Sequence, residues 1–176
     1  MPLLKNNAFV TDGWVHLGDD EAIADAPFVT VSLARLQKDW DVLARFAGQL
    51  GVRLPNTVRA TELQPYLSRL GLIVLAFPAF ADGRSYSLAR QLRLDGFQGE
   101  LRAAGNILPD QLQFMLQVGI DSFDVTDRFP VEAWGRASRQ MSLAYQRGLI
   151  RPAGEREVWS ERHRGFAAWE EQPHAG

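Results

Sequence analysis

One short stretch of the chain concentrates side chains that could do chemistry. Tyr86, Arg90 and Arg93 stand at i, i+4 and i+7, so they share one face of the helix expected over 87–94. Arg84 comes just before that helix. Guanidinium groups offer forked donors for carboxylate, phosphate or sulfur oxyanions, and a helix N-terminus adds free backbone N–H groups. The stretch therefore predicts an anion site.

The predicted site draws on this helix and on the strand and loop that follow it. Its anion-binding residues are Arg84, Ser87, Arg90, Arg102 and Asn106. Asp82 and Tyr86 are the candidates for acid–base chemistry, because a carboxylate and a phenol can exchange protons with a clamped substrate.

Each of these residues also has a purely structural interpretation. Arg90 on a polar helix face can simply be solvated, and Arg84 can pair with Asp82. Arg102 lies inside an expected strand, where a partly buried charge needs a partner. Glu100 is two residues away, hence on the same face, and could be that partner.

The elements that must position these residues alternate along the chain. Short β-branched or apolar runs predict strands, and apolar residues at helical spacing predict the helices between them. Residues 72–77 are apolar throughout, as in a central parallel strand covered on both faces. The expected strands are 28–33, 52–54, 72–77, 99–103 and 122–125, and the expected helices are 37–50, 61–70, 87–94, 109–118 and 130–147.

This alternation predicts an α/β fold of repeated βα units around a mainly parallel sheet of about five strands. The sheet could be an open three-layer sandwich or a truncated β/α barrel. In both, ligands bind at the carboxyl ends of the strands. We expect an irregular segment over 1–27 with an edge strand at 14–17, the α/β domain over 28–150, and a charged, aromatic tail over 151–176.

Composition excludes several classes of function. The chain has 19 Lys and Arg against 21 Asp and Glu, so it lacks the basic excess of a nucleic-acid binder. It has no cysteine, which removes thiolate chemistry and Cys-ligated metals. No apolar run approaches the roughly 20 residues of a membrane span, and no signal peptide is evident, so we expect a cytoplasmic protein.

Neither a metal nor a cofactor is indicated. The three histidines, His16, His163 and His174, have no neighbours at metal-ligand spacing. No glycine-rich dinucleotide motif or P-loop follows a strand, so the cofactor stays unassigned.

Four runs of the chain resemble a known bacterial family in their order and spacing. They are FADGRSYSLARQLR at 80–93, GELRAAGN at 99–106, DQ at 110–111 and GIDSF at 119–123. The family is a domain of unknown function whose members are labelled oxidoreductases of sulfite reduction. The resemblance implies an association with the assimilatory sulfite reductase haemoprotein. It supplies no catalytic residues.

Three hypotheses follow. In the first, an accessory protein of sulfite reduction binds the reductase haemoprotein or a small anionic ligand around Arg84, Arg90 and Arg102. In the second, an enzyme clamps an oxyanion-bearing substrate with these arginines and uses Tyr86 or Asp82 as acid or base. In the third, the chain is a structural subunit of a homo-oligomer, assembled through the aromatic tail and helix faces.

Overall fold

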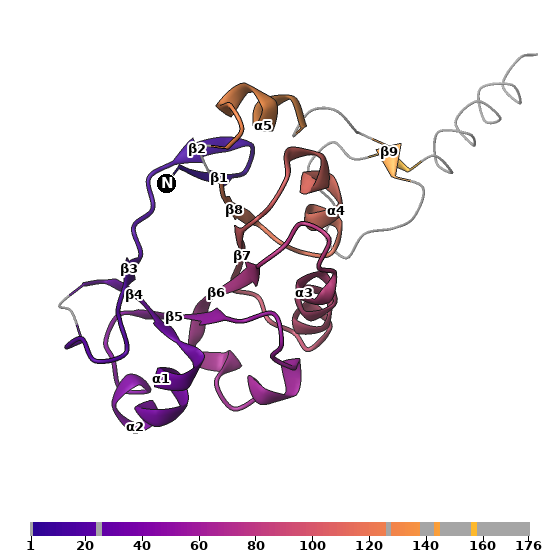
Figure 1. Cartoon of the computed structure of the whole chain (residues 1–176). Coiled ribbons are helices and arrows are strands. Elements are labelled where there is room, and N and C mark those ends of the chain that lie inside the picture. Colours follow the sequence, from indigo (N-terminus) through magenta and orange to yellow (C-terminus); the bar gives the residue numbers. More distant parts are fainter. Residues whose placement is uncertain (1, 24–25, 126–127, 138–142, 145–155, 158–176) are drawn as a thin grey trace, which may run out of the picture.

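The computed structural model of the chain describes residues 2–23, 26–125, 128–137, 143–144 and 156–157. Most of these residues belong to one eight-stranded sheet with helices packed against it (Figure 1). Two further short strands, β9 (Leu143–Ala144) and β10 (Arg156–Glu157), pair in parallel with each other. The remainder of the predicted tail lies outside the described residues.

The main sheet is mostly parallel. Its strand order is β2-β1-β8-β7-β6-β5-β4-β3. The strands from β3 to β8 run parallel to their neighbours, whereas β1 is antiparallel to both β8 and β2. The strands are β1 (Leu3–Lys5), β2 (Ala8–Val10), β3 (Val15–His16), β4 (Phe28–Ser32), β5 (Gln49–Leu54), β6 (Leu70–Phe77), β7 (Glu100–Gly105) and β8 (Ser122–Asp124).

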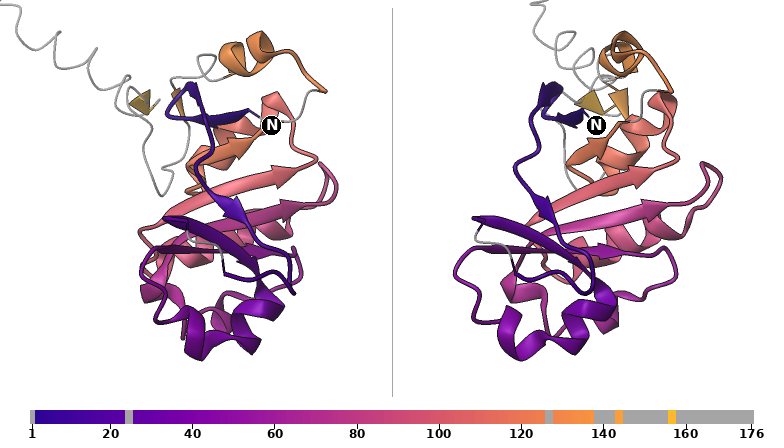
Figure 2. Two further views of the ribbon diagram at one scale, coloured as in Figure 1. Left: turned by 90° about the vertical axis from the view of Figure 1, so that its left-hand side faces the viewer. Right: turned by 60° about the vertical axis from the view of Figure 1, so that its left-hand side comes forward.

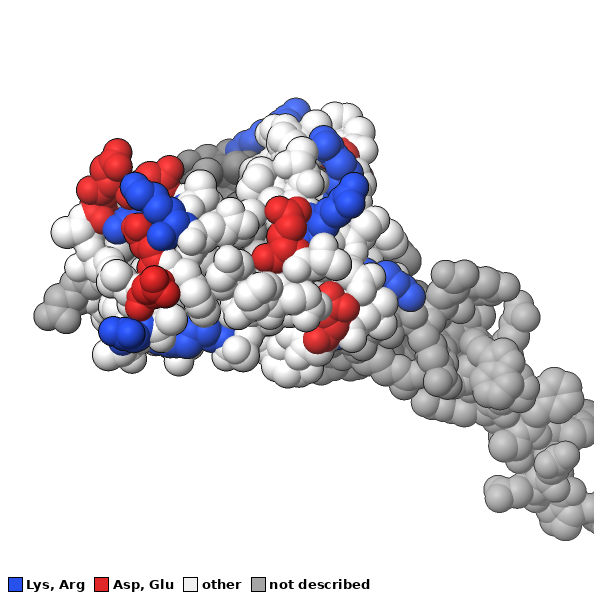
Figure 3. All heavy atoms as spheres, turned by 90° about the horizontal axis from the view of Figure 1, so that it is seen from below, with Lys and Arg blue, Asp and Glu red and all other residues white. Residues whose placement is uncertain are grey.

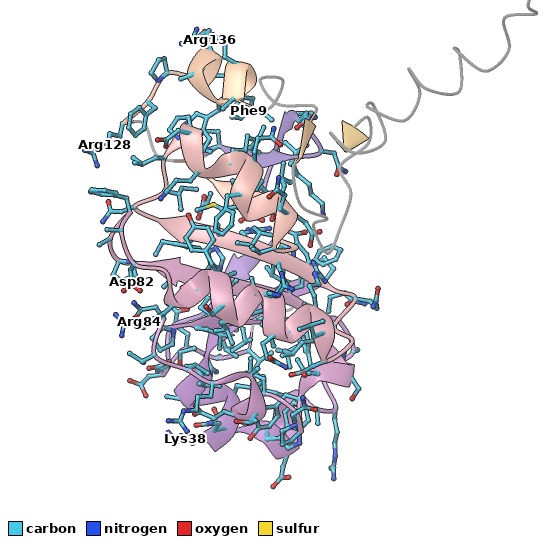
Figure 4. All side chains as sticks on the ribbon, turned by 90° about the vertical axis from the view of Figure 1, so that its right-hand side faces the viewer. Phe9, Lys38, Asp82, Arg84, Arg128 and Arg136 are labelled. Carbon is cyan, nitrogen blue, oxygen red and sulfur yellow. The ribbon has the colours of Figure 1, made fainter. Side chains whose placement is uncertain are left out.

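The helices that connect the parallel strands lie on one side of the sheet. Because β3 to β8 follow one another in sequence across the sheet, successive right-handed crossovers all fall on the same face. Figure 4 looks onto this face, with α3 and α4 in front of the strands. The helices are α1 (Leu33–Lys38), α2 (Trp40–Leu43), α3 (Arg84–Leu94), α4 (Leu112–Gln117) and α5 (Val131–Ala137), with 3₁₀ turns η1 (Ala60–Glu62), η2 (Leu67–Arg69) and η3 (Pro109–Gln111).

The sheet is curled into a half-barrel, and the short connection between its two edge strands requires this curl. Residues 11–14, which we call the strap, join β2 at one edge of the sheet to β3 at the other. Five Cα steps reach at most roughly 18 Å. Seven strand intervals on a flat sheet would cover roughly 33 Å. The strap therefore closes the distance only on the concave face of a curled sheet, where Figure 2 shows it crossing in front of the strands.

The two faces of the sheet carry different side chains. On the convex face, alternate residues such as Val52, Leu75 and Leu101 are fully buried against the helices and form the main core. On the concave face the alternate positions include Thr30, Arg53, Arg102 and other polar side chains. The core therefore lies between sheet and helices, and the polar positions gather inside the half-barrel.

The prediction of an α/β fold with a mainly parallel sheet is confirmed, and two details need correction. The sheet has eight strands rather than about five. The edge strand expected at 14–17 is present as β3, but the segment 1–27 also holds β1 and β2. The strands follow one sequential order, so the arrangement is the truncated barrel and not the open sandwich, which would need helices on both faces.

Several predicted helices are shorter than expected. Residues 37–50 hold only the ends of α1, the single turn of α2 and the start of β5, and 61–70 hold two 3₁₀ turns. Pro65 cannot donate a helical hydrogen bond, which explains the break in the second case. Of the helix expected over 130–147, α5 is present, while Leu143–Ala144 is a strand. Among the described helices none is long and apolar enough to cross a membrane.

Candidate functional site

The start of α3 and the loop after β5 form an open hollow at the carboxyl edge of the sheet. Its volume is about 440 Å³. Asn56, Thr57, Val58, Arg59, Ala60, Arg84, Ser87 and Leu88 line it, and we call it the Arg84 hollow. Two of the predicted anion-binding residues, Arg84 and Ser87, thus share one surface. Arg59 could not be predicted as part of this site, because the loop after β5 carries no motif.

Asp82 orients the Arg84 side chain. The Nε and Nη2 groups of Arg84 donate to the Asp82 carboxylate, the latter at 2.6 Å, and the backbone N–H of Arg84 donates to Asp82 Oδ1 at 3.1 Å. Figure 4 shows the two residues next to each other where α3 begins. The Arg84 side chain remains 59% exposed. It is therefore fixed in direction and still open to solvent.

This pairing makes Asp82 a weak base. Hydrogen bonds from the Arg84 side chain and backbone lower the pKa of Asp82 to about 2, and Asn56 adds a further donor. The carboxylate is ionised near neutral pH and already holds its partners. It is consequently poorly suited to take a proton from a substrate.

Tyr86 turns its ring into an aromatic cluster. The ring lies 5.1 Å from that of Phe77 and 5.0 Å from that of Phe114. Burial raises the pKa of the Tyr86 phenol, and the negative charge of Asp110 raises it further. The hydroxyl therefore stays protonated, and the contacts of the ring are those of a packing residue.

The remaining predicted residues on this side of the sheet have separate roles. Arg90 is exposed on the surface of α3. Asn106 is also exposed, and its side-chain amide donates to the carbonyl of Pro78 at 2.7 Å, which ties together the loops after β6 and β7.

Arg93 does not share the exposed face that its spacing predicts. Its side chain is only 8% exposed. The Nε group donates to the carbonyl of Gly119 at 2.9 Å, and Nη1 donates to the carbonyls of Phe97 and Gly99 at 2.7 and 2.8 Å. The Nη2 group pairs with Asp121. Arg93 is therefore a structural clamp beneath the C-terminal end of α3.

Arg102 lies on the other face of the sheet from Arg84 and Arg90. Its neighbours Leu101 and Ala103 pack in the core beneath the helices, so alternation turns Arg102 to the concave face. There it is 1% exposed and donates to Glu100 at 2.9 and 3.1 Å and to Asp12 of the strap at 2.7 Å. The three arginines of the predicted anion site therefore do not meet, although the expected Glu100–Arg102 pair is present.

Glu100 is the centre of this buried ion cluster. Besides Arg102, it accepts hydrogen bonds from Lys5 and Ser122, each at 2.6 Å. Burial raises the pKa of Glu100, but the donors from Lys5 and Ser122 and the charge of Arg102 outweigh burial, so the pKa is lowered overall. The cluster joins strands β1, β7 and β8 to the strap.

Three more residues of the concave face that could carry chemistry, His16, Arg53 and Asp124, lie outside the predicted anion site. The His16 ring nitrogen Nδ1 contacts the hydroxyl of Thr30, and Nε2 lies 3.8 Å from Asp12. Burial and the nearby charge of Arg53 lower the pKa of His16, against a smaller opposing effect of Asp12. Arg102 and Asp124 also act on this imidazole. In the sequence, Arg53 and Asp124 can be recognised as single charged residues within runs of apolar strand residues.

The surface charge of the described residues is mixed. Seen from below in Figure 3, Lys and Arg atoms are interspersed with Asp and Glu atoms and do not form one region of positive charge. No group of three or more His, Asp or Glu side chains suited to a metal ion occurs in the part of the chain that the structure describes.

Comparison with known proteins gives one family match. The model of a family described as a bacterial protein of unknown function, DUF934, matches residues 51–154, which is more than half of the chain. The match begins within β5 and extends beyond α5, and therefore includes the Arg84 hollow, Arg53 and Asp124. No curated protein matches the chain.

Proposed function

The chain belongs to the DUF934 family of bacterial proteins of unknown function, and we propose that it is an accessory protein of assimilatory sulfite reduction that binds a small oxyanion in the Arg84 hollow. The reductase haemoprotein is the partner that the resemblance of residues 80–123 implies. Oxyanion binding and the pathway are separate parts of this proposal and can be tested independently.

One observation carries the oxyanion part: two arginines and a hydroxyl line the same hollow at the start of α3. Asp82 occupies the Nε and Nη2 groups of Arg84, and Nη1 makes no hydrogen bond to any described residue. Arg59 and Ser87 are exposed beside it. A tetrahedral or pyramidal oxyanion can accept from both guanidinium groups and from the Ser87 hydroxyl, with the positive end of the helix dipole behind it.

The chemistry of the hollow supports binding more than turnover. Asp82 is ionised and held by Arg84 and Asn56, while Tyr86 is a protonated packing residue. The enzyme hypothesis needs one of these two groups to exchange a proton near neutral pH. The oligomer hypothesis depends on residues after Arg151, which fall almost entirely outside the described residues.

Calorimetric titration tests the oxyanion. Sulfite, under nitrogen, and sulfate are titrated into the full chain at low ionic strength, with chloride as the control anion. We expect Arg84→Gln and Arg59→Gln each to weaken binding at least about tenfold, because a hydrogen bond between charged groups contributes about 1.5–3 kcal/mol. Arg90→Gln, on the same helix but outside the hollow, should bind as the unaltered chain does. Equal affinity in all three variants would exclude this site.

Co-purification tests the pathway. The tagged full chain is recovered from cells of the source bacterium grown on sulfate and from cells grown on a reduced sulfur source. We expect the sulfite reductase haemoprotein to be retained from the sulfate-grown cells. If it is retained under neither condition, the pathway part of the proposal fails while the oxyanion site remains testable by titration.

A further inference from the structure

Two opposite charges on the concave face have no partner among the described residues. Arg53 alternates with the core residues Val52 and Leu54, and Asp124 with the core residue Phe123, so both side chains point into the half-barrel. Arg53 is exposed and Asp124 is partly exposed. Neither forms a hydrogen bond or an ion pair within the described chain, whereas Lys5, Glu100, Arg102 and Asp12 on the same face are all paired.

The sheet holds these two charges apart. Arg53 is in β5 and Asp124 is in β8, with β6 and β7 between them. Strands β5 and β8 would be roughly 14 Å apart on a flat sheet, and the curl shortens that distance. Both side chains therefore reach into the half-barrel from strands on either side of β6 and β7, and we call the interval between the guanidinium and the carboxylate the gap.

The floor of this gap is made of small side chains. Val74 and Ala76 of β6 and Ala104 of β7 occupy inward positions between the two charges; Val74 is buried and both alanines are partly exposed. Arg102 of β7 also faces inward, but its guanidinium is turned to Glu100 and Asp12. Long side chains here would fill the inside of the half-barrel. The two alanines leave their end of the gap open to a ligand.

The imidazole of His16 interacts electrostatically with both charges. Arg53 and Asp124 each act on its imidazole, as do Asp12 and Arg102, and the pKa of His16 is lowered. Near neutral pH the ring is therefore uncharged, and its Nδ1 is occupied by Thr30. His16 is therefore a polar residue of the concave face that adds no net charge. Asp19 already accepts from Ser32, at the end of β4, at 2.6 Å.

We propose that the concave face binds a small zwitterion, an α-amino acid with a short side chain, between Arg53 and Asp124. The carboxylate of the ligand takes the guanidinium fork of Arg53, and its ammonium group donates to Asp124. The alanine floor leaves room for a side chain of one or two heavy atoms. A plain anion would leave Asp124 unpaired and a plain cation would leave Arg53 unpaired, so the arrangement favours a ligand that carries both charges.

Titration of the full chain with matched ligands tests this site. The probes are glycine, L-alanine, L-serine and L-cysteine, the last with a reductant. Propionate and ethylamine are L-alanine without its ammonium group and without its carboxylate, respectively. We expect at least one of the amino acids to bind with a dissociation constant of roughly 1 mM or tighter. Propionate and ethylamine should each bind at least about tenfold more weakly than the amino acid.

Substitutions locate the site. Arg53→Gln and Asp124→Asn should each reduce amino-acid affinity at least about tenfold without changing the unfolding midpoint, since neither side chain has a structural partner among the described residues. Arg45→Gln, an exposed arginine on the helix side, is the matched control and should bind normally.

Three results would overturn the inference: none of the four amino acids binds, both site variants bind like the unaltered chain, or propionate binds as tightly as L-alanine. The site shares no residue with the Arg84 hollow. Loss of amino-acid binding therefore says nothing against the oxyanion, and Arg84→Gln should leave the amino acid bound.

Discussion

Arg35, Arg69 and Arg93 each bind backbone carbonyls at the end of a loop. Arg35 donates to the carbonyls of residues 18 and 21, and Arg69 to those of residues 44, 46 and 48. The guanidinium group suits this task because it presents several donors in a fixed plane and can satisfy carbonyls that would otherwise be buried without partners. Arginine content alone therefore does not locate a ligand site in this chain.

Arg93→Lys tests the clamp at the residue scale. A lysine keeps the charge but cannot reach the carbonyls of Gly119, Phe97 and Gly99 together. We expect the free energy of unfolding, measured by urea titration, to fall by about 1–3 kcal/mol because buried acceptors lose their donors. Arg90→Lys on the exposed face of the same helix should change it by less than about 0.5 kcal/mol. Equal values for the two variants would mean that Arg93 is solvated in solution.

Arg102→Met tests the buried ion cluster. Methionine fills much of the same space but leaves Glu100, whose side chain is 11% exposed, without its guanidinium. We expect a loss of about 3–5 kcal/mol in the free energy of unfolding, the range for breaking one side of a buried ion pair.

Glu100→Gln in the Arg102→Met background provides the control. It removes the uncompensated carboxylate and should recover part of the lost stability. If Glu100→Gln lowers the free energy of unfolding by the same amount in the Arg102→Met chain as in the unaltered chain, the side chains of Glu100 and Arg102 are not energetically coupled.

At the scale of elements, the concave face of the sheet should make stability depend on pH in two windows. The folded pKa of Glu100 is below its usual 4.5, so its contribution is complete above pH 4.5 and is lost as pH falls through the folded pKa. The folded pKa of His16 is below 6.5, so the unfolded chain takes up this proton first and stability falls as pH drops below 6.5.

Urea midpoints between pH 7.5 and pH 3 measure both windows. His16→Gln should flatten the decline just below pH 6.5, and Glu100→Gln should flatten it below pH 4.5, whatever each variant does to stability at neutral pH. A His16→Gln curve parallel to that of the unaltered chain through pH 6 would contradict the effect of burial and of the charge of Arg53 on the imidazole.

The elements that could be predicted from the sequence are those with a strong local pattern. The apolar run of β6 and the capped, periodic stretch of α3 are both present. Residues 37–50 misled the prediction, because Leu50 and Gly51 look like a helix end but lie inside β5. The strands β1 and β2 have three residues each, too few to show alternation, and their pairing with β8 is set by tertiary contacts.

The candidate sites likewise divide into features that follow from a local sequence pattern and features that depend on tertiary packing. The Glu100–Arg102 pair could be predicted because residues two apart in a strand share a face. The meeting of Arg59 with Arg84 could not, since it depends on how the loop after β5 packs on α3. The opposition of Arg53 and Asp124 depends on strand order and curl, which no local pattern of residues contains.

At the scale of the whole molecule, the N-terminal segment completes the half-barrel. The β1–β2 hairpin extends the sheet beyond β8, and the strap returns across the concave face to β3. Asp12 of the strap pairs with Arg102 at the centre of the sheet, and Trp14 lies over Gly51, whose missing side chain leaves room for the indole. One short segment therefore connects both edges of the sheet with its middle.

Because a single core runs from one end of the half-barrel to the other, we expect unfolding in one cooperative step. Leu43 of α2 and Trp134 of α5 lie at opposite ends of this core and are 0% and 1% exposed. Leu43→Ala should lower the free energy of unfolding by about 2–5 kcal/mol, and Trp134→Phe by less, since it keeps most of the ring volume. In each variant the unfolding transitions followed by circular dichroism and by tryptophan fluorescence should have the same midpoint, and that midpoint should be lower than in the unaltered chain. Separate transitions in the Leu43→Ala chain would show that the α2 end unfolds independently, and the half-barrel would then consist of two folding units.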